Sequence, residues 1–270
     1  DWSSDVCSSD LIYFTWKINL NLTHYKNKIT YLPDEKKTTV MDGHGGYMNG
    51  SRYYGEDLPI NTWYMKRFAG LSEDGLSLWY YTDKETNEEK TTTTYSTGDF
   101  YLCGDPNPDL YGGFGTSITF HGFDLSTQFS YLVGGLTYDY GYAGMMGNPT
   151  ATSVGNRWHK DVLKAWSPEN PSSTIPRWHF NDLNTTGSSD RFLIDGSYLN
   201  LQNIQVGYTL PDSWTSHLKI KNLRLYFVCD NVYYWSKRKG LDPRRSISGV
   251  GTSGKIAPFR TYSGGISLQF

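Results

Sequence analysis

The stretch Phe259-Arg-Thr-Tyr-Ser-Gly-Gly-Ile-Ser-Leu-Gln-Phe270 decides the fold class. Residues of one parity are mostly apolar, namely Phe270, Leu268, Ile266, Gly264 and Tyr262. Those of the other parity are polar or small, namely Gln269, Ser267, Gly265, Ser263 and Thr261. A period of two places one set on each face of a β-strand. A strand of a transmembrane β-barrel, apolar outside and polar inside, has this pattern, and so has a strand of a soluble sandwich.

The same alternation returns in five other stretches. Residues 12–25 carry Lys17, Asn19 and Asn21 on the polar face, and residues 114–120 and 123–131 follow one another through the short turn His121–Gly122. Two alternating runs joined by so few residues predict a β-hairpin. Residues 222–236 end in the aromatic run 233–235, which is typical of the girdle at a membrane interface.

Residues 197–208 predict a strand with a β-bulge. Leu199 and Leu201 share one parity, whereas Ile204, Val206 and Tyr208 share the other. A change of parity within a strand is what one extra residue near position 202 or 203 produces.

The composition favours an all-β fold. The chain has 270 residues and a formal net charge of −2, so it carries no global signal for nucleic-acid binding. It is 16% aromatic and contains 28 Gly, which favours pleated strands joined by turns. The absence of an apolar run of about 18 residues excludes a spanning helix, but a barrel needs an apolar residue only at alternate positions. Cys7, Cys103 and Cys229 are too widely spaced for a thiol or zinc motif, so we expect neither metal nor cofactor.

The connections between these strands alternate in length. The stretches 121–122 and 209–221 are short, whereas 71–111, 134–194 and 237–258 are long and polar, with a short helix expected at 158–166. An outer-membrane barrel has short periplasmic turns and long extracellular loops. The fold prediction from this pattern is therefore all-β: an antiparallel transmembrane β-barrel with long strands, long extracellular loops and short periplasmic turns.

Residues 1–11 are expected to be foreign to the protein. The stretch Asp1-Trp-Ser-Ser-Asp-Val-Cys-Ser-Ser-Asp-Leu11 back-translates to a DNA sequence that resembles the end of a sequencing-library adapter. We expect a non-native segment over 1–11 and the barrel portion over 12–270, which excludes Cys7 from the natural sequence.

Longer motifs resemble one family. The segment Asp195-Gly-Ser-Tyr-Leu-Asn-Leu-Gln-Asn-Ile-Gln-Val-Gly-Tyr-Thr-Leu-Pro211 is the most specific of them. Together with Asp109-Leu-Tyr-Gly-Gly-Phe-Gly-Thr-Ser-Ile-Thr-Phe-His-Gly-Phe-Asp-Leu125 and Trp166-Ser-Pro-Glu-Asn-Pro171, it resembles the SusC-like TonB-dependent outer-membrane receptors.

This resemblance implies a barrel of roughly 22 strands in the outer membrane of a Gram-negative cell, with an N-terminal plug in its lumen. It implies that this chain is the C-terminal part of that large barrel, with roughly seven long strands. It implies active import of oligosaccharides or peptides, driven by the TonB complex through a region outside this chain. It also implies a SusD-like surface lipoprotein as partner, with membrane lipid and lipopolysaccharide around the wall. The basic residues Lys237, Arg238, Lys239, Arg244 and Arg245 either contact lipopolysaccharide phosphates or form a solvated charged stretch.

Candidate ligand contacts lie in and beside the second long connection. Aromatic faces stack on sugar rings, and Arg offers a planar set of donors. The candidates are Arg157, Trp158, Trp166, Arg177, Trp178, His179 and Arg191. The alternative for each is packing within the loops. No catalytic motif is present, because the histidines lack zinc-like spacing and the serines lack a nucleophile elbow, so we expect no enzyme.

Two other functions have sequence support. A secreted carbohydrate-binding β-sandwich would also use aromatic strands, but it buries both inner faces, and Lys17, Asn19, Gln128 and Gln269 are poorly suited to burial. A passive outer-membrane porin differs by lacking a plug, which only sequence upstream of residue 12 decides.

The chain is expected not to fold stably when it is expressed alone. Its first and last strands have unpaired edges, which a lipid bilayer does not tolerate. The measurement is thermal unfolding of the purified 270-residue chain. A soluble, monomeric product that melts cooperatively contradicts the expectation.

Overall fold

A computed structural model describes residues 14–148, 157–182, 184, 187–215, 219–237, 242, 244, 249 and 258–270. The segment 1–11, with Cys7, lies outside these ranges. Within them, no helix is both long and apolar enough to cross a membrane.

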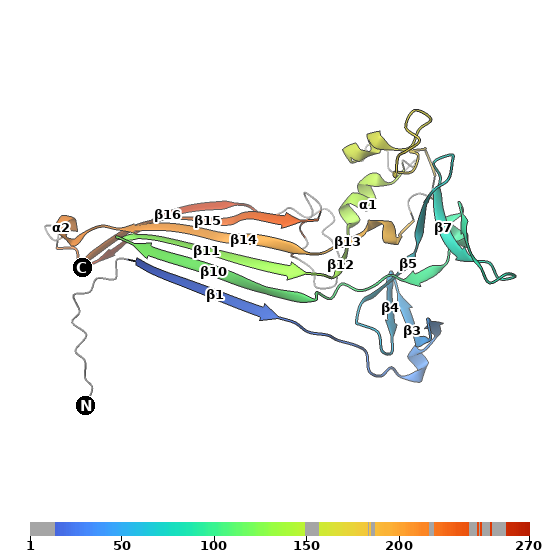
Figure 1. Cartoon of the computed structure of the whole chain (residues 1–270), viewed down its shortest axis with the longest axis horizontal. Helices are drawn as coiled ribbons and strands as arrows, with labels where there is room; N and C mark the ends of the chain where they lie inside the picture. Colours follow the sequence, from blue (N-terminus) through green and yellow to red (C-terminus); the bar gives the residue numbers. More distant parts are fainter. Residues whose placement is uncertain are drawn as a thin grey trace.

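A long antiparallel sheet of six strands dominates the described residues, against the roughly seven strands expected. The strands in spatial order are β1 (Phe14–Thr23), β10 (Leu110–Phe120), β11 (Phe123–Val133), β14 (Tyr198–Thr209), β15 (Asn222–Ser236) and β16 (Thr261–Gln269). The turn at His121–Gly122 joins β10 to β11, which confirms the predicted hairpin. The C-terminus lies at the same end of the strands as this short turn (Figure 1).

The register gives the sheet two chemically different faces. One row across the strands contains Trp16, Ile118, Leu125, Val206 and Phe227. A row on the opposite face contains Asn19, Gln128, Asn203, Asp230 and Thr261. These rows define the apolar face and the polar face. The alternation predicted from sequence is thus confirmed.

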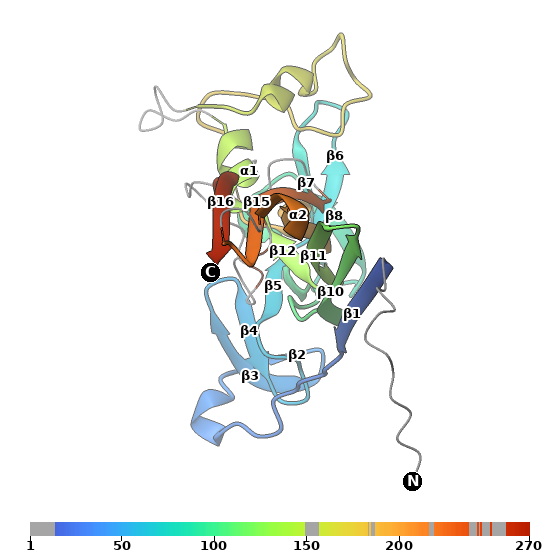
Figure 2. The ribbon, with the colours of Figure 1, turned by 90° about the vertical axis from the view of Figure 1, so that its left-hand side faces the viewer.

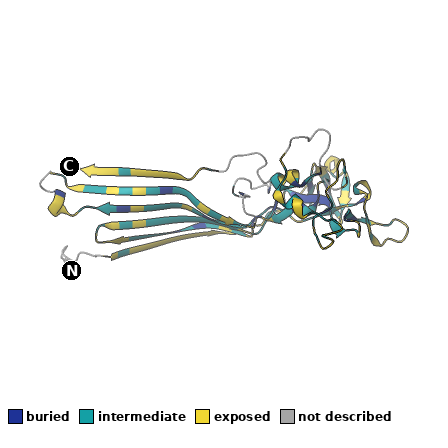
Figure 3. Cartoon of the chain, turned by 90° about the horizontal axis from the view of Figure 1, so that it is seen from above, coloured by how far each residue is buried: buried dark blue, intermediate teal, exposed yellow. Residues whose placement is uncertain are grey.

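Neither face is covered by another described element. Figures 1 and 2 show the long sheet as a curved layer that extends away from the rest of the chain. The side chains of Ile18 and Ile266 on the apolar face are accordingly 64% and 67% exposed, and Figure 3 shows the resulting bands of exposed residues along the strands. An apolar layer left open in this way requires an apolar environment outside the chain.

A β-bulge keeps the faces of β14 consistent. Pairing with both neighbours is interrupted between Leu201 and Asn203, so Gln202 is the inserted residue. This confirms the predicted bulge. Because of it, Asn200 and Asn203 lie on the same polar face, although three positions separate them.

An ion pair crosses β14 on the polar face near the short-turn end. The Arg224 guanidinium donates two hydrogen bonds, of 2.9 and 2.6 Å, to the Asp124 carboxylate. The strand between them contributes Gly207, and a Cβ there would collide with both side chains. Glycine at this position therefore allows the ion pair between Asp124 of β11 and Arg224 of β15 to form across β14.

The first long connection, residues 24–109, is folded. It forms a five-stranded sheet, a three-stranded sheet and two short 3-10 helices. Their bounds are η1 (Asp34–Lys36), β2 (Thr39–Met41), β3 (His44–Asn49), β4 (Arg52–Gly55), β5 (Thr62–Lys66), β6 (Phe68–Leu71), β7 (Ser77–Thr82), β8 (Glu89–Thr92), η2 (Tyr95–Thr97) and β9 (Phe100–Leu102). The predicted bounds of this connection, 71–111, are wrong at the start, because the connection begins directly after β1.

The second connection packs against the first. It contains β12 (Leu136–Tyr138), α1 (Tyr140–Met146), η3 (Lys160–Lys164), η4 (Asp190–Phe192) and β13 (Leu193–Asp195). The short helix expected at 158–166 is a five-residue 3-10 helix, η3. A four-residue helix, α2 (Asp212–Thr215), lies in the turn before β15.

The described hydrophobic core lies in these connections and not in the long sheet. Trp63, Met65, Tyr138, Met146 and Phe192 form one buried cluster. Beside it, the buried Lys66 ammonium donates to the carbonyl oxygens of Tyr95, Ser96 and Gly98. Burial lowers the pKa of Lys66, and the three carbonyls satisfy its donors.

Trp63→Ala is expected to lower the free energy of unfolding of the connections by about 3–5 kcal/mol, because it removes a fully buried indole. The measurement is hydrogen exchange, followed peptide by peptide over residues 24–109. Trp178→Ala is the control, since that side chain is 42% exposed and should cost about 1 kcal/mol or less. Equal effects of the two substitutions contradict the assignment of the core.

Candidate functional site

Polar side chains converge where the polar face meets the long connections. One row of the polar face at this end pairs Asn200 of β14 with Ser130 of β11 on one side and with Tyr234 of β15 on the other. Asn200 is 3% exposed, and its amide nitrogen donates to the Ser130 hydroxyl at 3.3 Å. We call this end of the polar face the mouth.

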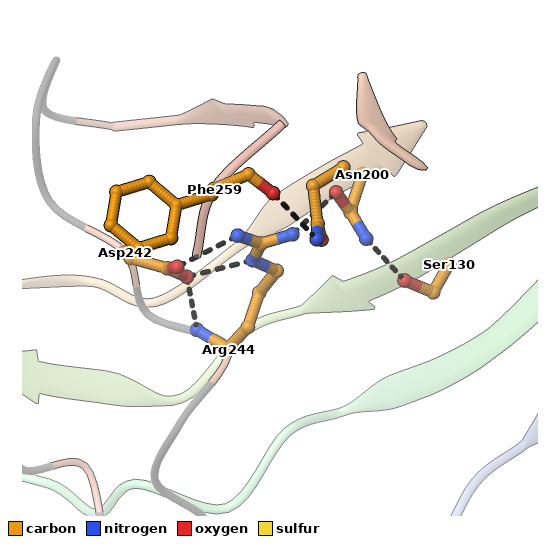
Figure 4. Close-up of polar contacts among 6 residues, drawn as sticks. Ser130, Asn200, Asp242, Arg244 and Phe259 are labelled. Atoms are coloured by element: carbon orange, nitrogen blue, oxygen red, sulfur yellow. Dashed lines mark hydrogen bonds and ion pairs between the residues drawn. The ribbon is translucent and has the colours of Figure 1, made fainter. Parts of the chain in front are cut away.

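Arg244, from the third long connection, returns to the sheet at the mouth (Figure 4). Its guanidinium donates to the Asn200 side-chain oxygen at 2.6 Å and to the two oxygens of Asp242 at 2.8 and 2.7 Å. It also lies 4.7 Å from the centre of the Tyr234 ring. Hydrogen bonding to Asp242 raises the pKa of Arg244, so the guanidinium is charged and largely neutralised by its partner.

A pocket of about 470 Å³ adjoins this cluster. Its walls include Asn200, Arg244 and the residues at the C-terminal end of β15, among them Tyr234. Asn231 donates to the carbonyl of Phe259 at 3.1 Å, and Arg260 donates to the carbonyl of Val232. The strand ends are thereby tied together around the pocket.

The arrangement can bind polar, uncharged groups. A guanidinium has five N–H donors, and the bonds above use three of them, so donors remain for hydroxyl or carbonyl oxygens. Tyr198 and Tyr234 add aromatic surface and hydroxyl groups. Across the described ranges, no three His, Cys, Asp or Glu side chains are grouped so as to hold a metal ion.

The residues predicted from sequence divide into separate groups. Trp158 and Trp178 come together, with ring centres 5.6 Å apart and the planes at 85°. Trp166 lies over Gly75, and the backbone amide of Arg177 donates to the Gly75 carbonyl at 2.9 Å. Both contacts join the second connection to the first.

The other three candidates differ in their exposure to solvent. Arg157 and His179 are exposed. Arg191 lies 5.2 Å from the Phe68 ring centre and 5.1 Å from that of Phe192. Burial lowers the pKa of Arg191 to about 10. The seven candidates therefore do not form one site, and their role as ligand contacts stays a prediction.

The residues of the mouth could not be predicted from the sequence. Nothing distinguishes Asn200 from the other polar residues of its strand before the register is known. Arg244 was expected in a basic surface stretch, whereas its side chain is only 14% exposed and pairs with Asp242. Lys237 is exposed, and Arg238, Lys239 and Arg245 lie outside the described residues.

Comparisons with known proteins support one class. No protein-family profile matches the chain. It is 28% identical to TonB-dependent receptor P3 of Formosa agariphila, over 95% of this chain and 27% of that protein. It is 26% identical to TonB-dependent receptor SusC of Bacteroides thetaiotaomicron, over 95% of this chain and 24% of that protein. The chain thus spans about a quarter of the length of these relatives.

Solved structures show the same fold. The chain superposes on a structure of the RagAB peptide transporter with a TM-score of 0.78 and 22% identity, over 96% of this chain and 28% of that one. The "open-open" state of the RagAB peptide importer gives a TM-score of 0.75 at 23% identity.

The resemblance to the SusC-like TonB-dependent receptors is confirmed. The relatives extend the similarity over nearly the whole chain. The long sheet has the fold of part of the β-barrel in such a receptor.

Arg244→Met is expected to lower the free energy of unfolding by about 3 kcal/mol, because Asp242, a buried carboxylate, loses two charged hydrogen bonds. Asp242→Asn combined with Arg244→Met should cost clearly less than the sum of the two single changes. The measurement is a double-mutant cycle from urea unfolding of the intact protein. Strictly additive costs contradict the coupling of this pair.

Proposed function

We propose that the chain forms part of the wall of a TonB-dependent outer-membrane transporter that imports oligosaccharides or peptides. The observation that carries the proposal is the two-faced sheet, which is apolar on one side and rich in amides and hydroxyls on the other. In a barrel, the apolar face contacts lipid and the polar face lines a wet lumen.

The apolar face fits lipid better than a second protein layer. Large side chains lie on it along both edges and the middle of the sheet, and Trp16, Leu20 and Phe227 are 59%, 62% and 50% exposed. The Trp16 indole donates to the Thr116 hydroxyl at 2.7 Å, so this polar group on the apolar face is satisfied within the sheet. Internal satisfaction of polar groups is what hydrocarbon demands.

The polar face opposes the sandwich alternative. A sandwich would bury Asn19, Gln128 and Asn203 in a dry core, where each amide without a partner costs a few kcal/mol. In the described sheet these groups face open space, and Asn203 donates to Asp230 at 2.7 Å. A hydrated lumen accommodates all of them.

The ligand class follows from the mouth and from the relatives. Neutral donors, acceptors and tyrosine rings at the mouth fit hydroxyl- or amide-rich oligomers. SusC is named as a TonB-dependent receptor and RagAB as a peptide transporter. On this basis we extend TonB-driven import to the chain, with a SusD-like lipoprotein as its surface partner.

The folded connections supply further contacts in this proposal. Trp158, Trp178, Arg157 and His179 belong to the second connection, beyond the mouth, where an incoming ligand would meet them first. Trp166, Arg177 and Arg191 contact the first connection and help to hold the loops together. Residues 1–11 take no part, since we interpret them as non-native.

Paired substitutions on neighbouring positions of β1 test the proposal. Ile18→Arg should make insertion into phospholipid vesicles less favourable by about 2–4 kcal/mol, because it puts a charge on the lipid face. Asn19→Arg, one residue along but on the polar face, is the matched control and should change it little. The measurement is a urea titration of the full-length receptor in vesicles. If both substitutions have the same cost, the two faces do not have the environments proposed.

A further inference from the structure

Besides the pocket of about 470 Å³, the mouth contains two adjoining compartments that differ in chemistry. The compartment around Asn200, Ser130 and Asn231 is polar. A neighbouring one, of about 370 Å³, is walled by tyrosine, proline and glycine residues. Tyr198 and Arg244 line both and form the partition between them. We call the two spaces the amide compartment and the ring compartment.

Aromatic and aliphatic groups build the ring compartment. Tyr25 and Tyr111 meet edge to face, with ring centres 6.0 Å apart. Pro106 and Pro108 also line this compartment, and Leu132 adds an aliphatic side chain from β11. Proline has no N–H, so this wall offers few donors and favours apolar groups.

A tight turn forms part of the wall of the ring compartment. Gly134 and Gly135 follow β11 with φ of +81° and +73°, a conformation that favours glycine. A Cβ at Gly134 would collide with the Asp109 carboxylate, and one at Gly135 with the Pro106 carbonyl. Glycine at both positions therefore allows the turn to pack directly against Pro106 and Asp109 beside the compartment.

We propose that the mouth recognises an amphipathic ligand: a hydroxyl- or amide-rich oligomer that carries an apolar group of ring size. The inference rests on the proposed function and narrows its substrate class. The oligomer binds in the amide compartment, and its apolar substituent occupies the ring compartment. Arg244 and Tyr198 donate to oxygens at the junction, because they are the polar side chains that face both spaces.

Two sources supply this chemistry. A saccharide carries it as an aromatic or acyl substituent, and a peptide carries it as an apolar side chain. The test therefore uses two matched pairs of probes: cellotriose with its phenyl glycoside, and the peptide Ala-Ser-Ala with Ala-Phe-Ala. Within each pair only the apolar group changes.

The experiment is calorimetric titration of the purified full-length receptor in detergent. Leu132→Asn is nearly isosteric and makes the ring compartment polar. It should weaken binding of the apolar-substituted member of the bound pair about tenfold and that of the plain member less than twofold. Tyr25→Ser, outside the strands, should act in the same direction, and it keeps the test valid if Leu132→Asn fails to fold.

Two controls separate the compartments. Asn200→Ala should weaken both members of a pair by similar factors, because it acts on the oligomer. Tyr31→Ser, at a side chain that is 70% exposed in the first connection, should change neither.

The outcomes distinguish this inference from the proposed function. If the wild-type receptor binds both members of a pair equally and Leu132→Asn changes both alike, the ring compartment has no role and only this inference fails. If the wild type binds neither pair, ligand binding at the mouth fails as well. Discrimination within one pair identifies the source as saccharide or peptide.

Discussion

Backbone hydrogen bonding between antiparallel strands is the constraint on which the rest depends. It fixes which residues lie in the same row across the sheet. Trp16 therefore shares a row with Phe227, and Asn19 shares one with Asp230, although each pair is more than two hundred positions apart in sequence. No side-chain core holds these strands together, since neither face is covered by a described element. The ladder and the surrounding medium must therefore supply the stability that packing supplies elsewhere.

The folded connections obey a different rule. There the largest fully buried side chains gather, namely Trp63, Trp79, Tyr53 and Met65. An aqueous environment explains the contrast, because burial of apolar surface stabilises only where water is the alternative. The long sheet and the folded connections of this chain are thus stabilised in different ways. The mouth lies at their junction, where polar groups from the sheet and a guanidinium from a connection meet within hydrogen-bonding distance.

Sequence patterns predicted what is periodic and missed what is not. The hairpin at His121–Gly122 and the bulge at Gln202 were recoverable because each interrupts a two-residue period in a defined way. Strands of three to six residues, such as β2 and β3, are too short for such a signal. The position of Arg244 depends on how a distant connection folds back onto Asn200, and no local pattern encodes that contact. Trp158 and Trp178 contact each other within one connection, whereas their role as ligand contacts stays a prediction.

The Arg224–Asp124 pair over Gly207 has a mechanical consequence. Sliding one strand past its neighbour by a register step would separate two charged groups that are joined across three strands. Tyr226 lies flat across Gly265 of β16 at the same level, which extends the cross-link to the next strand. At the short-turn end the register is therefore held by side chains as well as by the backbone ladder, so sliding of β11, β14 and β15 past one another is resisted there.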